Sequence, residues 1–192
     1  MARVTPLPPE SFGRYTWNNG KVAVVDIASR YRDDTTARDW PATLWRLGQT
    51  AIVEESRFSD LSGFGRLQVV TRGQGLTLHT DDGATHRDLS RAFDVVRYDG
   101  ATKLTAKIAD GPVEVLNLIY REDAFDADLF VPLGDVTLKP GETVLYASGN
   151  PARVTIDGLF FELPAGHALK IDGAAKLSTT GGPIFAASLT SR

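Results

Sequence analysis

Short strand-like runs separated by turn signals constrain this chain of 192 residues more than any other feature. From Pro41 to the end, alternating or β-branched runs follow one another, and Gly or Pro separates them. Asp-Gly occurs five times, at 82–83, 99–100, 110–111, 157–158 and 172–173. This pair tolerates the positive φ angles of a type I′ hairpin turn, so the chain repeatedly doubles back. The pattern predicts an all-β sandwich or barrel.

Helix signals are sparse. One helical turn is expected near 8–12, and another within 87–92 or 124–130. Strand, glycine turn, strand units at 71–78, 138–145 and 163–171 are similar to the rim hairpins of cupin barrels. The predicted strands cover 43–53, 66–71, 75–80, 93–98, 103–108, 113–120, 135–138, 143–147, 152–156, 159–163, 168–171, 174–178 and 183–189.

Two halves of similar texture predict two abbreviated antiparallel β-barrels or sandwiches. The length is ample for a hydrophobic core, and residues 1–192 are expected to form one compact, bicupin-like unit. The N-terminal half is placed at 14–122 and the C-terminal half at 123–192. Residues 123–135 are the expected connector.

Composition excludes several classes of function. The chain has no cysteine, so it has no disulfide scaffold, thiol nucleophile or zinc ribbon. Its 21 basic and 24 acidic residues give a net charge of −3 without long runs of one sign, which does not fit a nucleic-acid surface. No apolar stretch resembles a signal peptide or a bilayer span. We therefore expect a cytoplasmic protein with no membrane or nucleic-acid partner, and leave monomer and homodimer open.

The strand around Arg46 carries the clearest candidate for ligand binding. By the period of two, Arg46 shares one face with Gly48 and Thr50, while the opposite face is mostly apolar. A long cation beside small neighbours leaves room for a ligand, and a guanidinium binds a carboxylate through two parallel hydrogen bonds. The alternative is an arginine at the surface or in a structural ion pair. Arg66 is expected at a rim, where it either holds a second carboxylate or pairs with Asp60.

Asn117 is the polar exception on a face otherwise made by Val113, Val115 and Ile119. A buried Asn must find partners for its amide, and a ligand, a backbone group or a water molecule would serve. Structural hydrogen bonding near a bulge is the competing interpretation.

Catalytic motifs are absent from the sequence. The histidines are His79, His86 and His167, and Thr77 stands where a metal-binding cupin would place a second His. No nucleophile elbow, phosphate loop or dinucleotide fingerprint occurs. We therefore predict no catalytic residue, metal or cofactor, and an enzyme stays open only as a metal-free isomerase or lyase acting on a small acidic or sugar substrate.

Four motifs occur in order across most of residues 14–121. They are Trp17-Asn-Asn-Gly20, then Trp45-Arg46 with Phe58-Ser59, Gly63 and Arg66, then Tyr98-Asp-Gly100, and finally Asp110 to Asn117. Together they resemble the HutD/Ves family of the cupin superfamily. The departures are those expected of a diverged member: Lys21, Val22, Val24, Asp26, Gly48, Thr50, Ser62 and Gly65 replace the residues typical of the family.

The resemblance implies a bicupin that acts as a cytoplasmic accessory protein linked to histidine utilisation, with small acidic ligands such as formylglutamate. It adds Trp17, Asn19 and Ser59 to Arg46, Arg66 and Asn117 as ligand-binding candidates. Turn chemistry alone is the alternative for the Asn-Gly pair. A small carboxylate metabolite is the expected partner, a non-enzymatic binding protein is the expected function, and a purely structural module is a third interpretation.

Overall fold

The computed structural model describes residues 1–16 and 23–192 and confirms the all-β prediction. Across those ranges the chain forms nineteen strands and one 3₁₀ turn, η1 (Pro9–Ser11), where a short helical turn was expected. No helix in these ranges has the length and apolar character required to cross a bilayer.

The described chain divides into two compact units. One, called here the central unit, comprises Gly13–Asp123. The other, called the terminal unit, combines Met1–Phe12 with Ala124–Arg192. The first twelve residues therefore belong with the C-terminal part of the chain. That both halves pack as one body stays a prediction.

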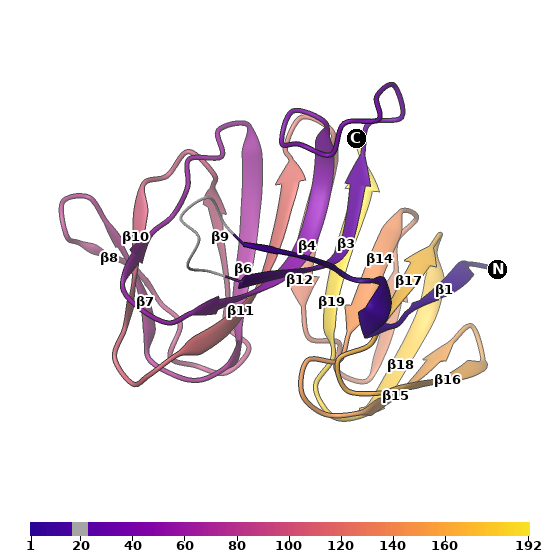
Figure 1. Ribbon diagram of the computed structural model, residues 1–192. Coiled ribbons are helices and arrows are strands. Elements are labelled where there is room, and N and C mark those ends of the chain that lie inside the picture. The colour runs from indigo at the N-terminus through magenta and orange to yellow at the C-terminus, as the bar shows by residue number, and fades with distance from the viewer. Residues whose placement is uncertain (17–22) are drawn as a thin grey trace. The chain divides into compact units, whose positions relative to one another are not determined.

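The central unit contains a six-stranded and a four-stranded antiparallel sheet, most of whose strands are labelled in Figure 1. Apolar residues from both sheets, among them Val70, Leu78, Leu104 and Val115, form one buried core. The larger sheet has the order β2 (Gly13–Thr16), β3 (Ala23–Tyr31), β4 (Thr43–Ile52), β11 (Val113–Arg121), β6 (Phe64–Arg72) and β9 (Val95–Asp99), and the smaller has β5 (Ser56–Arg57), β10 (Leu104–Ile108), β7 (Leu76–Thr80) and β8 (Thr85–Asp88).

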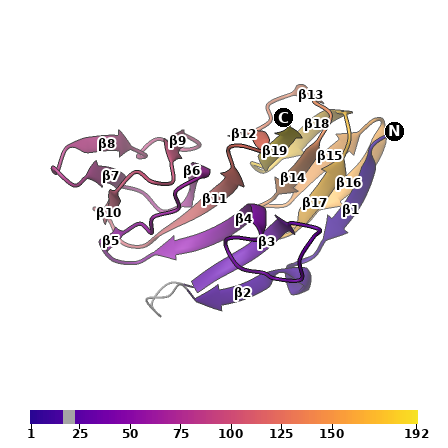
Figure 2. The ribbon, with the colours of Figure 1, turned by 90° about the horizontal axis from the view of Figure 1, so that it is seen from above.

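The terminal unit repeats this plan with a five-stranded and a four-stranded antiparallel sheet. Its core is almost entirely aliphatic and draws on both sheets. The larger sheet has the order β1 (Arg3–Leu7), β17 (Ala168–Asp172), β14 (Glu142–Tyr146), β19 (Phe185–Ser191) and β12 (Phe125–Phe130), with β1 along its edge (Figure 2), and the smaller has β13 (Asp135–Leu138), β18 (Ala175–Gly181), β15 (Ala152–Ile156) and β16 (Leu159–Leu163).

Local sequence accounts for most of these strands. All thirteen predicted strands are present, with ends shifted by a few residues at most. At Asp157-Gly158 both residues have positive φ, 49° and 84°, and the pair joins β15 to β16 as a tight hairpin. In β4, Trp45 and Leu47 are fully buried on the face opposite Arg46, as the period of two predicts.

Two predictions outside those strands are wrong, the second helical turn at either of its two positions and the connector. Residues 124–130 form strand β12 and not a helical turn, because Phe125, Ala127 and Leu129 alternate with exposed Asp126 and Asp128. The expected connector 123–135 therefore contains a strand of the terminal unit. Residues 87–92 end strand β8 and continue as an irregular segment instead of a helix.

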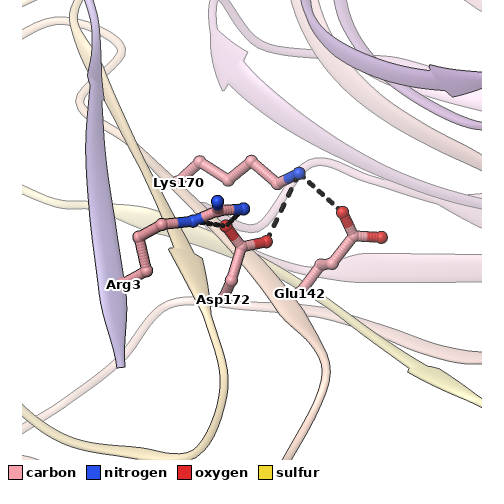
Figure 3. A network of polar contacts seen from close by, with 4 residues as sticks. All are labelled: Arg3, Glu142, Lys170 and Asp172. Carbon is pink, nitrogen blue, oxygen red and sulfur yellow. Dashed lines mark hydrogen bonds and ion pairs between the residues drawn. The ribbon is translucent and has the colours of Figure 1, made fainter. Parts of the chain in front are cut away.

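A charge network fixes β1 to the terminal unit (Figure 3). Arg3 donates two hydrogen bonds to Asp172 Oδ2, at 2.9 and 3.1 Å, across the paired strands β1 and β17. Lys170 Nζ lies 2.6 Å from Glu142 Oε1 and 3.4 Å from Asp172 Oδ1. The register aligns Arg3, Asp172 and Glu142 in one row over three strands. The positive charges of Arg3 and Lys170 and the negative charges of Asp172 and Glu142 thus balance in this network.

Candidate functional site

Two rows of side chains cross the large sheet of the central unit and face the same side. The pairing of β4, β11 and β6 places Arg46, Ile119 and Arg66 in one row. The adjacent row on that face contains Gly48, Asn117 and Gln68. Because alternate residues of a strand share a face, residues distant in sequence converge on one surface.

These rows form the floor of a cavity of about 290 Å³. This volume is at the lower end of the range for small-molecule sites, about 300–1,000 Å³. Gly48 lines this cavity without a side chain, and a Cβ there would lie 3.2 Å from the Val25 carbonyl oxygen. The lining residues in the described ranges are Tyr15, Val24, Arg46, Gly48, Thr50, Ile52, Ser56, Arg57, Phe58, Ser59, Arg66, Gln68, Val115, Asn117 and Ile119.

Arg66 is a buried cation in this cavity. The residue is only 5% exposed, and its Nε has no hydrogen-bond partner among the described residues. Its guanidinium carbon lies 4.9 Å from the centre of the Phe58 ring and 5.1 Å from that of Tyr98. Burial lowers the pKa of Arg66, but arginine keeps its proton in proteins. The faces of the two aromatic rings attract the cation. No carboxylate in the described part of the chain forms an ion pair with it, and Tyr98 is the only ionisable neighbour that affects its pKa.

Two amides next to Arg66 also have unused hydrogen-bonding atoms. Gln68 is fully buried, and its Oε1 accepts a hydrogen bond of 2.8 Å from the Tyr98 hydroxyl. Burial raises the pKa of Tyr98 to about 12, so this hydroxyl remains a donor. Gln68 Nε2 and Asn117 Oδ1 have no partner among residues 1–16 and 23–192. Unpaired buried polar atoms are rare in folded proteins, and here they gather in one cavity.

Arg46 differs from Arg66 in having a carboxylate partner. Its Nη2 donates a 3.2 Å hydrogen bond to Asp26 Oδ2, and both side chains are largely buried. The guanidinium also lies 4.4 Å from the Tyr15 ring centre and 5.2 Å from that of Trp40. Burial raises the pKa of Asp26, with Arg46 opposing the shift. Burial likewise raises the pKa of Tyr15, to about 12.

The outer side of the cavity carries a second ion pair. Arg57 Nη2 contacts both carboxylate oxygens of Asp81, at 2.6 and 2.8 Å, and both side chains are at least half exposed. Arg57 belongs to β5, and β5 is followed by Phe58 and Ser59, which also line the cavity. The segment 56–59 therefore covers one side of the site.

The structure brings four of the six predicted site residues together: Arg46, Arg66, Asn117 and Ser59 all line this cavity. Trp17 and Asn19 lie outside the described residues. Arg66 was expected at a rim, but the structure buries it inside the cavity. Strand β6 begins at Phe64, so Arg66 lies within the strand and on the face that forms the cavity floor. It does not pair with Asp60, whose Oδ1 accepts hydrogen bonds from Ser62. Arg46 lines the cavity and also forms an ion pair with Asp26, so the predicted ion pair is present and its binding of a ligand stays a prediction.

Two of the three histidines, His79 and His86, contact residues outside the cavity lining. His79 Nε2 lies 2.9 Å from Thr77 Oγ1, and Nδ1 lies 3.3 Å from the Gly83 carbonyl oxygen. The His86 ring contacts Tyr98 edge-on, with ring centres 6.4 Å apart. Within the described ranges, no three His, Asp or Glu side chains gather in an arrangement suited to a metal ion.

Comparison with known proteins identifies the family. The profile of the HutD family matches residues 10–184. The chain belongs to the HutD family. An uncharacterized 21.2 kDa protein in the region 3′ of hutC in Pseudomonas putida is 27% identical over 160 residues, which cover 82% of this chain and 80% of that protein. The gene of that relative lies in the histidine-utilisation locus, so this HutD-family chain is linked to that locus through a relative.

Solved structures show the same fold. HutD from Pseudomonas fluorescens, solved in a formate condition, superposes with a TM-score of 0.81 at 22% identity, covering 99% of this chain and 100% of that chain. A cupin 2 conserved barrel domain protein from Leptotrichia buccalis superposes with a TM-score of 0.52 at 8% identity, covering 93% and 92%. The cupin-type fold of this HutD-family chain is therefore confirmed.

Sequence reasoning missed Gln68, Tyr15 and Tyr98 as parts of the site. A signal for Gln68 was present, because it follows Arg66 by two residues and so shares its face in β6. Tyr15 and Asp26 had no such signal. They reach Arg46 only because β2 and β3 pair beside β4.

Proposed function

We propose that this HutD-family protein binds a small carboxylate metabolite in the cavity of the central unit, without catalysing its conversion. Its role in the cell is accessory or regulatory, within histidine utilisation. The ligand class is that of the small carboxylates of such a pathway, which include the dicarboxylate formylglutamate and the monocarboxylate urocanate.

The observation that carries this proposal is the buried guanidinium of Arg66, whose Nε has no hydrogen-bond partner and which forms no ion pair with a carboxylate among the described residues. Removing a charge from water costs several kcal/mol unless a counter-charge compensates it. No carboxylate among the described residues does so for Arg66, and a bound carboxylate would. Arginine suits this task because its planar N–H groups match two carboxylate oxygens.

The neighbouring amides favour the same conclusion. Gln68 Nε2 is an unused donor next to Arg66, and Asn117 Oδ1 is an unused acceptor in the adjacent row. A ligand with both acceptor and donor groups satisfies them, while Ile52, Val115 and Ile119 contact its apolar part. The cavity thus combines apolar walls with a few converging polar atoms, as small-molecule sites do.

Binding accounts for the cavity better than acid–base catalysis does. A general acid or base works best with a pKa near the ambient pH. The cavity lining in the described ranges includes no Asp, Glu, His or Lys, and its Tyr15 has a pKa raised to about 12. The competing function is a metal-free isomerase or lyase, which would convert the ligand and not only bind it.

A carboxylate panel tests the proposal. The purified protein is titrated with formylglutamate, urocanate, glutamate and histidine while its thermal unfolding is followed. A ligand at about 100 times its Kd adds about 2.7 kcal/mol of stability, which raises Tm by roughly 5–10 °C in a protein of this size. Arg66→Met and Arg46→Ala are expected to abolish or weaken the response. The matched control Arg153→Met removes an exposed strand arginine of the terminal unit and leaves the response intact.

Two results contradict the proposal. One is the absence of stabilisation by every carboxylate in the panel. The other is unchanged binding by both cavity variants. NMR spectra of the bound ligand, recorded over hours, separate binding from catalysis, since a binding protein returns its ligand unaltered and an isomerase or lyase does not.

A further inference from the structure

Three arginines line the cavity, and their partners differ. Arg46 pairs with Asp26 at 3.2 Å, and Arg57 pairs with Asp81 at 2.6 Å. Arg66 pairs with no carboxylate in the described chain. The charges of the first two are therefore cancelled by the protein itself. The cavity offers one net positive charge, and that charge lies at Arg66.

We infer that Asp26 is a specificity-determining residue that limits this cavity to ligands with a single carboxylate, bound at Arg66, and a neutral hydrogen-bond acceptor, such as an amide carbonyl, bound at Arg46. This inference rests on the proposed function and narrows it. It disfavours dicarboxylates relative to monocarboxylates of the same length. Within the panel above, it therefore separates formylglutamate and glutamate, which carry two carboxylates, from urocanate and histidine, which carry one.

The sheet geometry sets the distance between the two ends of such a ligand. Arg46 and Arg66 lie in one row with Ile119 between them, on β4, β11 and β6. Neighbouring strands are about 4.8 Å apart, so the two backbone positions are separated by roughly 10 Å. The Arg66 end also provides the free donor Gln68 Nε2, which suits a carboxylate oxygen. Ile119 lies between the two arginines, and its apolar side chain suits contact with a short aliphatic chain in the middle of the ligand.

Arg46 keeps its ability to donate hydrogen bonds although its charge is compensated. A guanidinium has five N–H groups, and the bond to Asp26 Oδ2 uses one of them. Remaining N–H groups can bind a carbonyl oxygen of a ligand. A carboxylate at the same place would bring a second negative charge close to Asp26 in a largely buried site, where like charges repel strongly.

The packing around Asp26 holds the carboxylate in this position. Asp26 pairs with Gly13 on β2 and with Gly48 on β4. A Cβ at Gly13 would lie 3.2 Å from the Asp26 Cβ, so the missing side chain at Gly13 provides room for Asp26. The Asp26 side chain is only 12% exposed. Arg46 holds Oδ2 of this carboxylate, while Oδ1 has no hydrogen-bond partner among the described residues.

The test compares ligands that differ only in the charge at one end. Isothermal titration at neutral pH measures the affinities of malonate, succinate and glutarate, and of the corresponding monoamides malonamate, succinamate and glutaramate. We expect the monoamide of the best-fitting length to bind at least about 10-fold more tightly than its diacid, which is about 1.4 kcal/mol.

Variants at Asp26 assign this preference to its charge. Asp26→Asn frees the charge of Arg46, so we expect the diacid to gain at least about 10-fold relative to its monoamide. Asp26→Glu keeps the charge and is expected to keep the monoamide preference. The wild-type comparison requires no variant, so it stands even where Asp26→Asn folds poorly.

Each outcome decides the inference. A diacid that binds the wild-type protein as tightly as its monoamide overturns it, as does failure of both series to bind, or an unchanged preference in folded Asp26→Asn. These results leave the proposed function standing whenever another carboxylate of the panel binds and Arg66→Met abolishes that binding. Loss of all carboxylate binding contradicts both.

Discussion

The two units of this protein share a two-sheet plan but fill the interior differently. In the terminal unit, the core between the sheets consists of aliphatic residues such as Leu145, Val154 and Ile171. In the central unit, the aliphatic core gives way to a cavity whose floor includes Arg66, Gln68 and Asn117. The same two-sheet plan thus encloses an aliphatic core in the terminal unit and a cavity with a polar floor in the central unit.

The two units also differ in whether their buried polar side chains have hydrogen-bond partners. In the terminal unit, the buried Thr143 hydroxyl has a partner, Ser188 Oγ, at 2.9 Å. In the central unit, Arg66, Gln68 and Asn117 each have a buried atom without a partner in the described ranges. Satisfied polar groups stabilise a fold, whereas unsatisfied ones cost free energy. The difference agrees with the proposal that the polar residues of the central unit serve a ligand and not stability.

The most severe test of this contrast exchanges a residue type between the units. Leu145→Asn places an amide in the aliphatic core and is expected to lower the free energy of unfolding by about 4 kcal/mol, from lost packing and an unsatisfied amide. The reciprocal change, Asn117→Leu, is expected to alter it by no more than about 1 kcal/mol. Urea denaturation measures both. Equal losses would remove the distinction between the two interiors.

The next largest effect is expected at Arg66. Arg66→Met removes a buried charge and keeps an apolar side chain, so we expect the free energy of unfolding to rise by about 1–3 kcal/mol. Carboxylate binding is lost in the same variant. Denaturation without ligand, paired with titration, measures the two changes. A marked loss of stability would mean that Arg66 has a structural role.

A smaller effect is expected at the satisfied polar pair of the terminal unit. Thr143→Val removes the hydrogen bond to Ser188 and is expected to cost about 1 kcal/mol. Ser188→Ala and the double variant complete a cycle that isolates the pair. A coupling free energy near zero in thermal denaturation would show that the hydrogen bond between Thr143 and Ser188 does not stabilise the fold. That result would weaken the contrast between the two units.

The smallest expected effect concerns pH. Burial raises the pKa of Asp26 above its value of about 3.9 in the unfolded chain, so the folded protein holds this proton more tightly. The contribution of Asp26 to stability is therefore greatest at low pH. It falls as the pH rises from about 4 through the raised pKa, and is constant above that.

Asp26→Asn lacks this contribution. The stability of the wild-type protein relative to Asp26→Asn is thus expected to decline over that pH window. Denaturation curves at pH 4, 5, 6 and 7 measure the trend. A relative stability that increases with pH would mean that Arg46 outweighs burial and holds the pKa of Asp26 below its usual range.

The positions of strands were largely predictable from sequence, because alternation and turn residues act locally. β12 was predictable in principle, since Phe125 to Leu129 alternates strictly between apolar and acidic residues. β1 and its place beside β17 were not, because Arg3 finds Asp172 only through a pairing between the two ends of the chain.

The candidate site divides in the same way. Arg46 and Asn117 stand out in sequence as polar residues among small or apolar neighbours on one face, and both line the cavity. Arg66 was expected at a rim, because a turn precedes it in sequence. Its burial depends on Phe58 and Tyr98, which come from a preceding loop and from β9.

The sequence by itself determined the all-β fold, the hairpins and the arginine-bearing faces, because strand periodicity and turn conformation are properties of neighbouring residues. The tertiary structure alone decided which arginine is neutralised. Asp26 lies 20 residues from Arg46 in the chain and meets it only when β3 pairs with β4. Partners of a buried charge depend on strand pairing, and pairing register is a property of the folded sheet.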